Sequence, residues 1–448
     1  MHERTQRAIA RLMFVFCCAV PTSVTVLCVL VTWTPAYHGY QLRKLEASLS
    51  DDTDLVIEIE DFRRPTPSSL ELTHVRALDP ETGAEVATVR KLQWVSNGQD
   101  VAIVLHQPNL QSKELANTWK LVHDRFLCVP QRTSIPVQVS ANALTIVSAA
   151  GSQTFKDVRA WIDPQFDAVG AVLQATPADS GATSPIDISI RRTRGESPAT
   201  QWTLDTHDTP LHCSALAEYV PEIQSLGGDA MFFGVMRWQL SSKDWWIDLS
   251  GSRFEDVSLS RLFERHAHRL TGSATVELKR CRIEPNHPRS DIAGTLWARN
   301  GVIGQTLLRS AKKHLKFALA PEVLATPTVD PEYDLLALDF ELNSTQLAIN
   351  GICRSDEMYH GFPADVVLCR DHLPLVQSTG TTINAIEIAN VLASPASVSI
   401  PVSSQTTWLL NVLVPPSRPL PSESHYPPRI RSAGVSQGGP TIQQPTVR

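Results

Sequence analysis

The stretch Leu12–Trp33, LMFVFCCAVPTSVTVLCVLVTW, runs for 22 residues without a charged side chain. An α-helix needs about 20 consecutive apolar residues to cross the hydrocarbon core of a bilayer. The stretch therefore predicts one membrane-spanning helix over residues 12–33. This predicted membrane anchor includes Leu12, Val20, Val26 and Trp33.

Charges on the two sides of this stretch indicate its orientation. Arg4, Arg7 and Arg11 precede it, whereas the segment that follows soon becomes acidic at Asp51 and Asp52. Basic residues stay preferentially on the cytoplasmic side of a membrane helix. We therefore expect residues 1–11 to lie in the cytoplasm and the rest of the chain to be exported.

A cleaved signal peptide is the alternative interpretation of the same stretch. The apolar core of a signal peptide spans about 7–15 residues and ends in a site of small residues. Here the apolar run is longer and closes on Val-Thr-Trp-Thr-Pro-Ala, residues 31–36. These features favour a retained anchor, and both interpretations place the remaining chain outside the cytoplasm.

Composition limits what the exported part can be. The chain has 448 residues, a formal net charge of −6 and a hydrophobic content of 42%. The exported part is long enough for two or three domains of about 150 residues. A net negative charge and the absence of a basic patch with interleaved aromatic residues argue against nucleic acid as a partner.

Cysteine usage differs from that of a small secreted domain held together by disulfides. Three of the eight cysteines lie in the apolar stretch, and five lie outside it with no C-x-x-C spacing. Cys353 and Cys369 are close enough in sequence to pair across neighbouring strands. The alternative is that both are buried free thiols that pack as small hydrophobic groups.

The exported chain alternates apolar and polar residues with a period of two, which is typical of half-buried strands. Leu55, Ile57 and Ile59 illustrate the pattern, with Glu58 and Glu60 on the opposite side. The pattern recurs without a βαβ rhythm, which predicts a mainly β protein with an elongated, curled and antiparallel sheet.

Turns and helices punctuate this pattern. Asp79–Gly83 and Asn97-Gly98 are typical of hairpin turns, and a further hairpin turn is expected at residues 343–345. Apolar residues recur at helical spacing from Leu115 to Phe126, and a second short helix is expected over residues 214–223.

Several strands place apolar side chains on one face, and these residues are the candidate binding surface. They are Val101, Ile103, Leu105, Trp238, Leu240, Val276 and Leu278. The plainer interpretation is that the same residues form an ordinary filled core. Alternation alone cannot distinguish an apolar trough that is open to a ligand from a packed interior.

The chain divides by composition into an N-terminal β-rich region at residues 34–210 and a C-terminal β-rich region at residues 211–413. Residues 414–448 carry eight prolines and four arginines against one glutamate. This composition predicts a disordered, Pro-rich tail that is partly polyproline-like.

Two segments resemble the AsmA family of membrane-anchored bacterial envelope proteins. The first covers residues 42–95, where Leu70, Leu72 and Val75 form a Leu-x-Leu-x-x-Val strand before the Asp-Pro-x-Thr-Gly turn at residues 79–83. The second covers residues 249–311, where Val-x-Leu-x-x-Leu at residues 257–262 precedes strands led by Gly272 and Gly294. The segment at residues 150–210 matches this family little.

The resemblance implies a curled β-sheet with an apolar groove, anchored in the inner membrane with its C-terminal body in the periplasm. The implied role is phospholipid movement between membranes, or maintenance of outer-membrane lipid balance. The implied partners are the inner membrane, a phospholipid or other acyl-chain ligand, and an envelope protein.

No catalytic motif accompanies these features. The chain lacks G-x-S-x-G, G-x-x-x-x-G-K-[ST], H-E-x-x-H and G-x-G-x-x-G. His266, His268, Cys281 and His287 could form a metal site, but their spacing follows no zinc pattern. We therefore expect no enzymatic activity, no catalytic or metal-binding residues and no cofactor.

The sequence thus predicts a membrane-anchored protein that binds or conducts lipid on an apolar β-surface during envelope biogenesis. The alternative is a non-enzymatic anchored β-sandwich scaffold or interaction protein with a filled core. A third possibility, an exported hydrolase, lacks support from any motif.

Overall fold

The computed structural model describes residues 11–129, 135–149, 151–165, 167–179, 181, 184–194, 198–216, 221–240, 245–284, 291–325, 329–343 and 345–392. The predicted tail, the predicted cytoplasmic segment up to residue 10, and His287 lie outside these ranges. For Leu240 the backbone is described but the side chain is not.

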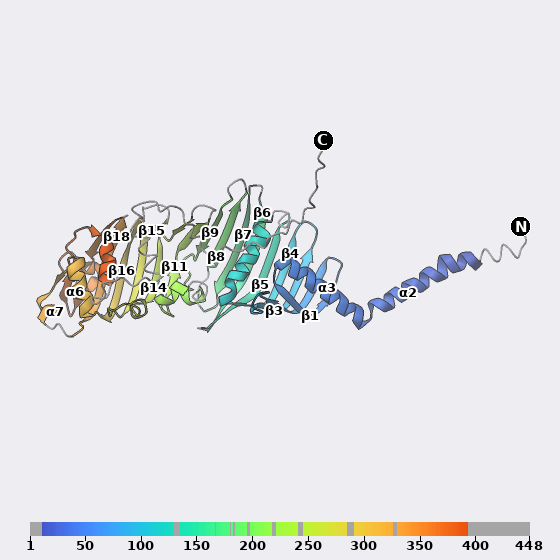
Figure 1. Cartoon of the computed structure of the whole chain (residues 1–448), viewed down its shortest axis with the longest axis horizontal. Helices are drawn as coiled ribbons and strands as arrows, with labels where there is room; N and C mark the ends of the chain where they lie inside the picture. Colours follow the sequence, from blue (N-terminus) through green and yellow to red (C-terminus); the bar gives the residue numbers. More distant parts are fainter. Residues whose placement is uncertain are drawn as a thin grey trace, which may run out of the picture. The chain divides into compact units, whose positions relative to one another are not determined.

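The N-terminal helices come first in the chain (Figure 1). The predicted membrane segment is one continuous helical run, in which Arg11–Thr32 is long and apolar enough to cross a membrane and has no buried residue. It contains a π-helical turn just before Pro21, where proline cannot donate the usual helix hydrogen bond. The successive elements are η1 (Val15–Ala19), α2 (Val20–Thr32) and α3 (Pro35–Thr53).

The rest of the described chain is dominated by strands. The strands of its first half are β1 (Val56–Arg63), β2 (Ser69–Leu78), β3 (Glu85–Ser96), β4 (Val101–Gln111), β5 (Val137–Ser148), β6 (Gly151–Pro164), β7 (Ala168–Pro177), β8 (Ile186–Thr193), β9 (Thr200–Asp205), β10 (Leu211–His212) and β11 (Met231–Phe233). Those of the second half are β12 (Val235–Leu240), β13 (Trp245–Asp248), β14 (Ser252–Ser258), β15 (Ser273–Ile283), β16 (Asp291–Val302), β17 (Ala318–Leu319), β18 (Glu332–Asn343), β19 (Gln346–Gly351), β20 (Val366–Arg370), β21 (Leu373–Gln377) and β22 (Ile383–Asn384).

These strands form one 22-stranded mixed sheet that does not close on itself, so the predicted mainly β fold is confirmed. From β1 to β9 each strand pairs with the next along the chain, and β9 then pairs with β12. The sheet therefore continues across residue 210, the predicted region boundary. Among the described strands, β4 and β5 alone run parallel, and every other pairing is antiparallel.

Short helices connect the strands. The parallel step from β4 to β5 contains η2 (Ser112–Glu114), α4 (Leu115–Lys120) and η3 (Leu121–Leu127), at the position of the first predicted helix. The second predicted helix is two 3₁₀ segments, η5 (Cys213–Leu216) and η6 (Pro221–Leu226). The remaining helices are α5 (Leu259–Leu262), α6 (Gln305–His314), α7 (Pro321–Ala325), η7 (Cys353–Ser355), η8 (Glu357–Tyr359) and α8 (Ile386–Leu392).

The predicted hairpin turns at residues 79–83 and 97–98 are present, whereas the turn predicted at residues 343–345 includes a residue outside the described ranges. Between β2 and β3 the Asp79 carboxylate accepts hydrogen bonds from the Thr82 hydroxyl at 2.7 Å and from the Glu81 backbone N–H at 3.1 Å. Between β3 and β4, Gly98 adopts the left-handed conformation with φ of +84°, which glycine reaches without a steric penalty.

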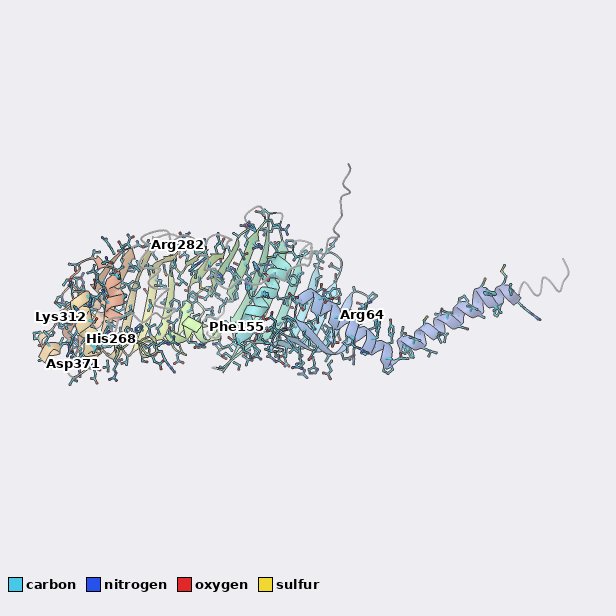
Figure 2. The ribbon with its side chains drawn as sticks, in the orientation of Figure 1. Arg64, Phe155, His268, Arg282, Lys312 and Asp371 are labelled. Carbon is cyan, nitrogen blue, oxygen red and sulfur yellow. The ribbon has the colours of Figure 1, made fainter. Side chains whose placement is uncertain are left out.

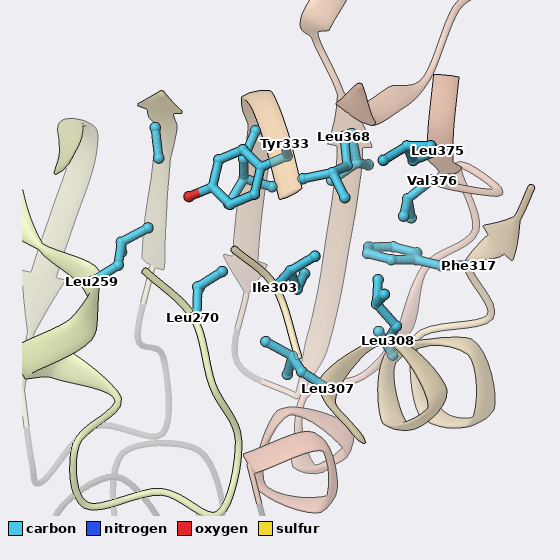
Figure 3. Close-up of a cluster of buried hydrophobic side chains, with 14 of the residues drawn as sticks. Leu259, Leu270, Ile303, Leu307, Leu308, Phe317, Tyr333, Leu368, Leu375 and Val376 are labelled. Atoms are coloured by element: carbon cyan, nitrogen blue, oxygen red, sulfur yellow. The ribbon is translucent and has the colours of Figure 1, made fainter. Parts of the chain in front are cut away.

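A filled hydrophobic core packs α6 and α8 against the C-terminal strands (Figure 3). Tyr333 is 1% exposed, and its hydroxyl donates a 2.5 Å hydrogen bond to the Thr271 carbonyl oxygen. Burial raises the pKa of the Tyr333 phenol to about 12. Its ring lies directly against Gly301, where a Cβ atom would overlap both the ring and the Thr271 oxygen.

Candidate functional site: the apolar face of the sheet

One face of the sheet carries rows of apolar side chains that cross many strands. Register partners in neighbouring strands project to the same face, so a row can be followed from strand to strand. The row through Ile103 crosses nine strands and comprises Leu70, Trp94, Ile103, Val139, Ala160, Leu173, Ile188, Leu204 and Met236. Leu204 is buried, and the other eight side chains are only half-buried.

A second row lies two residues further along the same strands. It comprises Val101, Val137, Ile162, Ala171, Ile190, Trp202, Trp238, Ile247 and Ile283. Because side chains two residues apart in a strand share a face, the two rows form one apolar surface. We call these two rows the apolar face.

The structure brings together four of the predicted residues. Val101, Ile103 and Leu105 lie on β4, and Trp238 lies on β12 within the apolar face. All four side chains are half-buried, whereas residues of an ordinary core are almost fully buried. Leu240 continues the β12 strand and pairs with Thr200.

Val276 and Leu278 lie further along the sheet, on β15. Val276 pairs with Phe254 on one side and Leu296 on the other. Phe254 packs against the same cluster of side chains as Leu105 and Trp238, which connects β15 to the apolar face. Both predicted residues are half-buried.

Helical segments cover part of the apolar face. Trp119 and Val122 of α4 and η3 pack over Ile162, Ile190 and Trp202. The Trp202 indole contacts the indoles of both Trp119 and Trp238. The rings of Trp202 and Trp238 are stacked at a centroid distance of 4.7 Å. Sequence reasoning identified Trp238 but missed this aromatic cluster, because its members are far apart in the chain.

The cysteines do not form disulfides in this structure. Cys353 and Cys369 are both 0% exposed and belong to one cluster behind β18 and β20. The pKa of Cys353 is raised mainly by a hydrogen bond between the two thiols and secondly by burial, so Cys353 stays protonated. The structure therefore shows the second of the two alternatives, buried free thiols that lie in contact.

One group of side chains has the composition of a metal site. The ligand atoms of His123, Asp124 and Cys128 lie within 4.8 Å of one another. The Cys128 sulfur is 3.7 Å from Nδ1 and 3.9 Å from Nε2 of His123, so it lies along neither nitrogen lone pair. The Arg192 guanidinium lies 3.5 Å from Nε2 and would repel a cation. Burial also raises the pKa of the Cys128 thiol, which disfavours the thiolate that metals bind.

The other metal candidate gains no support from the described residues. His268, which is labelled in Figure 2, is buried, and its Nδ1 lies 3.0 Å from the Thr306 hydroxyl oxygen. Cys281 is buried on β15, where desolvation raises the pKa of its thiol to about 11. Within the described part of the chain, His266, His268 and Cys281 do not gather into a group of potential ligands.

Comparison with known proteins adds no assignment: no family model, curated protein or solved structure matches this chain. The site must therefore be interpreted from its own geometry.

Proposed function

We propose that this protein is a membrane-anchored, non-enzymatic lipid-binding or lipid-conducting protein that holds acyl chains against the apolar face. One observation carries the proposal: the row through Ile103 crosses nine strands, and eight of its nine side chains are only half-buried. A continuous apolar surface that is not fully covered is a surface that an apolar ligand can complete.

The energetics favour such a surface for lipid transfer. Leaving an apolar environment for water costs about 0.8 kcal/mol per CH₂, or roughly 12 kcal/mol for an acyl chain of about 16 carbons. A protein surface that replaces the bilayer for part of the chain removes much of this cost. The device needs no nucleophile, metal or cofactor.

The N-terminal helix supports a proposal for the position of the protein in the cell. We propose that Arg11–Thr32 anchors the protein in the bacterial inner membrane, with the N-terminus in the cytoplasm and the sheet in the periplasm. Only α3 separates this helix from β1, the first strand of the sheet. The apolar face therefore begins near the end of the chain that carries the proposed anchor. This arrangement, and the resemblance noted in the sequence, are the grounds for proposing an AsmA-like role in envelope lipid transport.

A site-specific photocrosslinker distinguishes bound lipid from a filled core. Ile103 and Ala102 are adjacent on β4, but Ile103 projects into the apolar face and Ala102 is exposed on the other face. With benzoylphenylalanine at Ile103 in living cells, we expect mass spectrometry to detect a phospholipid adduct. The same group at Ala102 should give none and serves as the matched control.

The scaffold alternative has its own structural support, since the core around α6 and α8 is filled. It predicts equal and negligible lipid adducts at Ile103 and Ala102, and protein that purifies from native membranes without stoichiometric lipid. Negligible lipid adducts at Ile103 would overturn the lipid-binding proposal. Purified protein without stoichiometric lipid would overturn it as well.

A further inference from the structure

A line of polar residues runs from strand to strand across the first region. Strand pairing is interrupted at the same level in several successive strands. The register passes from Thr73↔Lys91 to Val75↔Val89, and from Lys91↔His106 to Val89↔Pro108. The residues that it skips include Glu60, His74, Arg90, Gln107, Asn142 and Asp157.

The backbone is strained along this line. His74, Gln107 and Asp157 have φ of +48°, +52° and +51°, in the left-handed region that non-glycine residues rarely adopt. Strained residues of this kind persist where the surrounding structure demands them, and they cluster at ligand sites. Three of them at one level of a single sheet indicate a common local architecture.

A cavity of about 640 Å³ opens at this level. Seven of its nine lining residues have polar side chains, among them His74, Arg90, Lys91, His106 and Gln107. Leu105, one of the predicted lipid-facing residues, also lines it. The cavity therefore adjoins the apolar face on β4.

The charges around the cavity do not cancel. Lys91 pairs with Glu71 at 3.1 Å, and the His74 ring contacts Glu60 at 2.6 Å. Arg90 instead donates a 3.3 Å hydrogen bond to the neutral side chain of Gln107, and among the described residues it contacts no carboxylate. The exposed Arg90 guanidinium thus has no anionic partner among the described residues and is accessible to an anion that enters the cavity.

A second polar group at the cavity is also unsatisfied. His106 Nε2 is shielded from solvent and has no hydrogen-bond partner among the described residues. Because solvent does not reach this atom, it does not itself face the cavity. The part of His106 that lines the cavity is the rest of the residue.

We propose that this cavity binds a phosphate group, held by the Arg90 guanidinium with His106 and Gln107 beside it. Guanidinium is the side chain best suited to phosphate oxygens because its N–H groups form a planar fork. The phosphate comes either from a lipid headgroup or from a free phosphate compound. This inference goes beyond the proposed function and does not require acyl-chain binding at Ile103.

The test uses the full-length protein purified in dodecyl maltoside, a detergent without phosphate, and follows ligand binding by ³¹P NMR and isothermal titration calorimetry. The probes are inorganic phosphate and the short-chain lipid dihexanoyl phosphatidylglycerol, with phosphate-free dihexanoylglycerol followed by calorimetry alone. We expect the wild-type protein to bind at least one phosphate probe and to bind dihexanoylglycerol at least tenfold more weakly. Binding of phosphatidylglycerol alone identifies a lipid headgroup as the source, and binding of both identifies phosphate itself as sufficient.

Two variants locate the site. Arg90→Gln removes the cation, and Gln107→Glu keeps the contact to Arg90 while placing a carboxylate in the cavity. Both should weaken phosphate binding at least tenfold, and Gln107→Glu should retain the wild-type thermal unfolding midpoint. Arg191→Gln, an exposed arginine on β8 that pairs with Asp167, is the matched control and should bind as the wild type does.

Unchanged phosphate binding in both Arg90→Gln and Gln107→Glu would overturn the inference, as would equal affinity for dihexanoylglycerol and phosphatidylglycerol. Lipid adducts at Ile103 in a protein that binds no phosphate probe would also overturn it, while leaving the proposed function intact.

Discussion

Trp202 of β9 and Trp238 of β12 are register partners, and their rings stack at an interplanar angle of 19°. The two strands are separated in the chain by β10, β11 and the 3₁₀ segments η5 and η6. The stacked pair therefore joins the first half of the sheet to the second, at the centre of the apolar face. Trp119 adds the covering helix to the same contact.

We expect Trp238→Ala to destabilise the protein by about 3 kcal/mol, because truncating a tryptophan in packed surroundings removes both apolar burial and the ring contact. Arg237→Ala, at the exposed neighbour on the opposite face, should change the free energy of unfolding by less than about 0.5 kcal/mol. Urea unfolding followed by far-UV circular dichroism measures both. Equal effects of the two substitutions would show that the stack carries no special stability.

Close packing at Gly301 allows a prediction from geometry alone. Any Cβ at this position meets the Thr271 carbonyl oxygen and the Tyr333 ring, neither of which can move freely. Gly301→Ala should therefore cost about 1–3 kcal/mol or more through overpacking. Gly361→Ala is the control, because a Cβ there meets no atom within 4 Å. A thermal unfolding midpoint for Gly301→Ala as high as that of Gly361→Ala would contradict the close approach of Tyr333 to this glycine.

The contact between His207 and Asp187 predicts a pH dependence. The hydrogen bond to the Asp187 carboxylate, 3.1 Å from His207 Nε2, raises the pKa of the His207 ring above its ordinary value. A group with a raised folded-state pKa stabilises the fold fully below its unfolded pKa, and this contribution is lost as pH rises through the folded pKa.

The wild-type protein should therefore exceed His207→Asn in stability at about pH 5.5, and the difference should disappear by about pH 9. Because both side chains are partly exposed, the effect should be small and should weaken in high salt. Repeating the comparison in an Asp187→Asn background removes the interaction. A pH-dependent difference that survives there would show that another group is responsible.

The membrane helix can be tested by charge insertion. Val26→Arg together with Leu27→Arg places two cations near its centre, each costing about 2.5–3.5 kcal/mol of insertion free energy. We expect the double variant to be released by carbonate extraction, whereas the wild type stays with the membrane. Val95→Arg, at an exposed position on β3, should behave as the wild type does. Retention of the double variant would argue against a spanning helix.

The buried thiols predict a pattern of alkylation. In a variant that lacks Cys17, Cys18 and Cys28, folded protein should react with a maleimide at exposed Cys128 and not at Cys353 or Cys369. The reason is that burial keeps these thiols inaccessible and raises the pKa of Cys353, and only the thiolate is reactive. Both should react after denaturation without reductant. Failure to react then would reveal a disulfide between them.

Much of this fold could be predicted from local patterns. The alternation at Leu55, Ile57 and Ile59 and the turns at Asp79–Gly83 and Asn97-Gly98 report on neighbouring residues, and the structure has the strands and hairpins that they predict. The parallel pairing of β4 with β5 could not be predicted, since alternation does not encode strand direction. The signal that was present is the helical stretch from Leu115, because parallel neighbours need a crossover connection.

The apolar face and the polar cavity at Arg90 differ in how far they could be predicted from the sequence. The sequence pattern identified Val101, Ile103 and Leu105 because these residues alternate along a single strand and so share a face. Arg90, His106 and Gln107 were not found, because each resembles an ordinary solvent-facing strand residue. Their meeting depends on registers between strands and on left-handed conformations at non-glycine residues, which no sequence motif marks.

The strand-by-strand order of the sheet has a consequence for how the protein unfolds. From β1 to β8 each strand pairs only with its neighbours in the chain, as units do in repeat proteins, where stability is approximately a sum of local terms and interfaces. Denaturation should then begin at one end and spread, with partly melted species populated between the native and the fully unfolded ensemble. Hydrogen exchange should accordingly be slowest in β5–β8, and the thermal unfolding transition should be broader than that of a two-state domain.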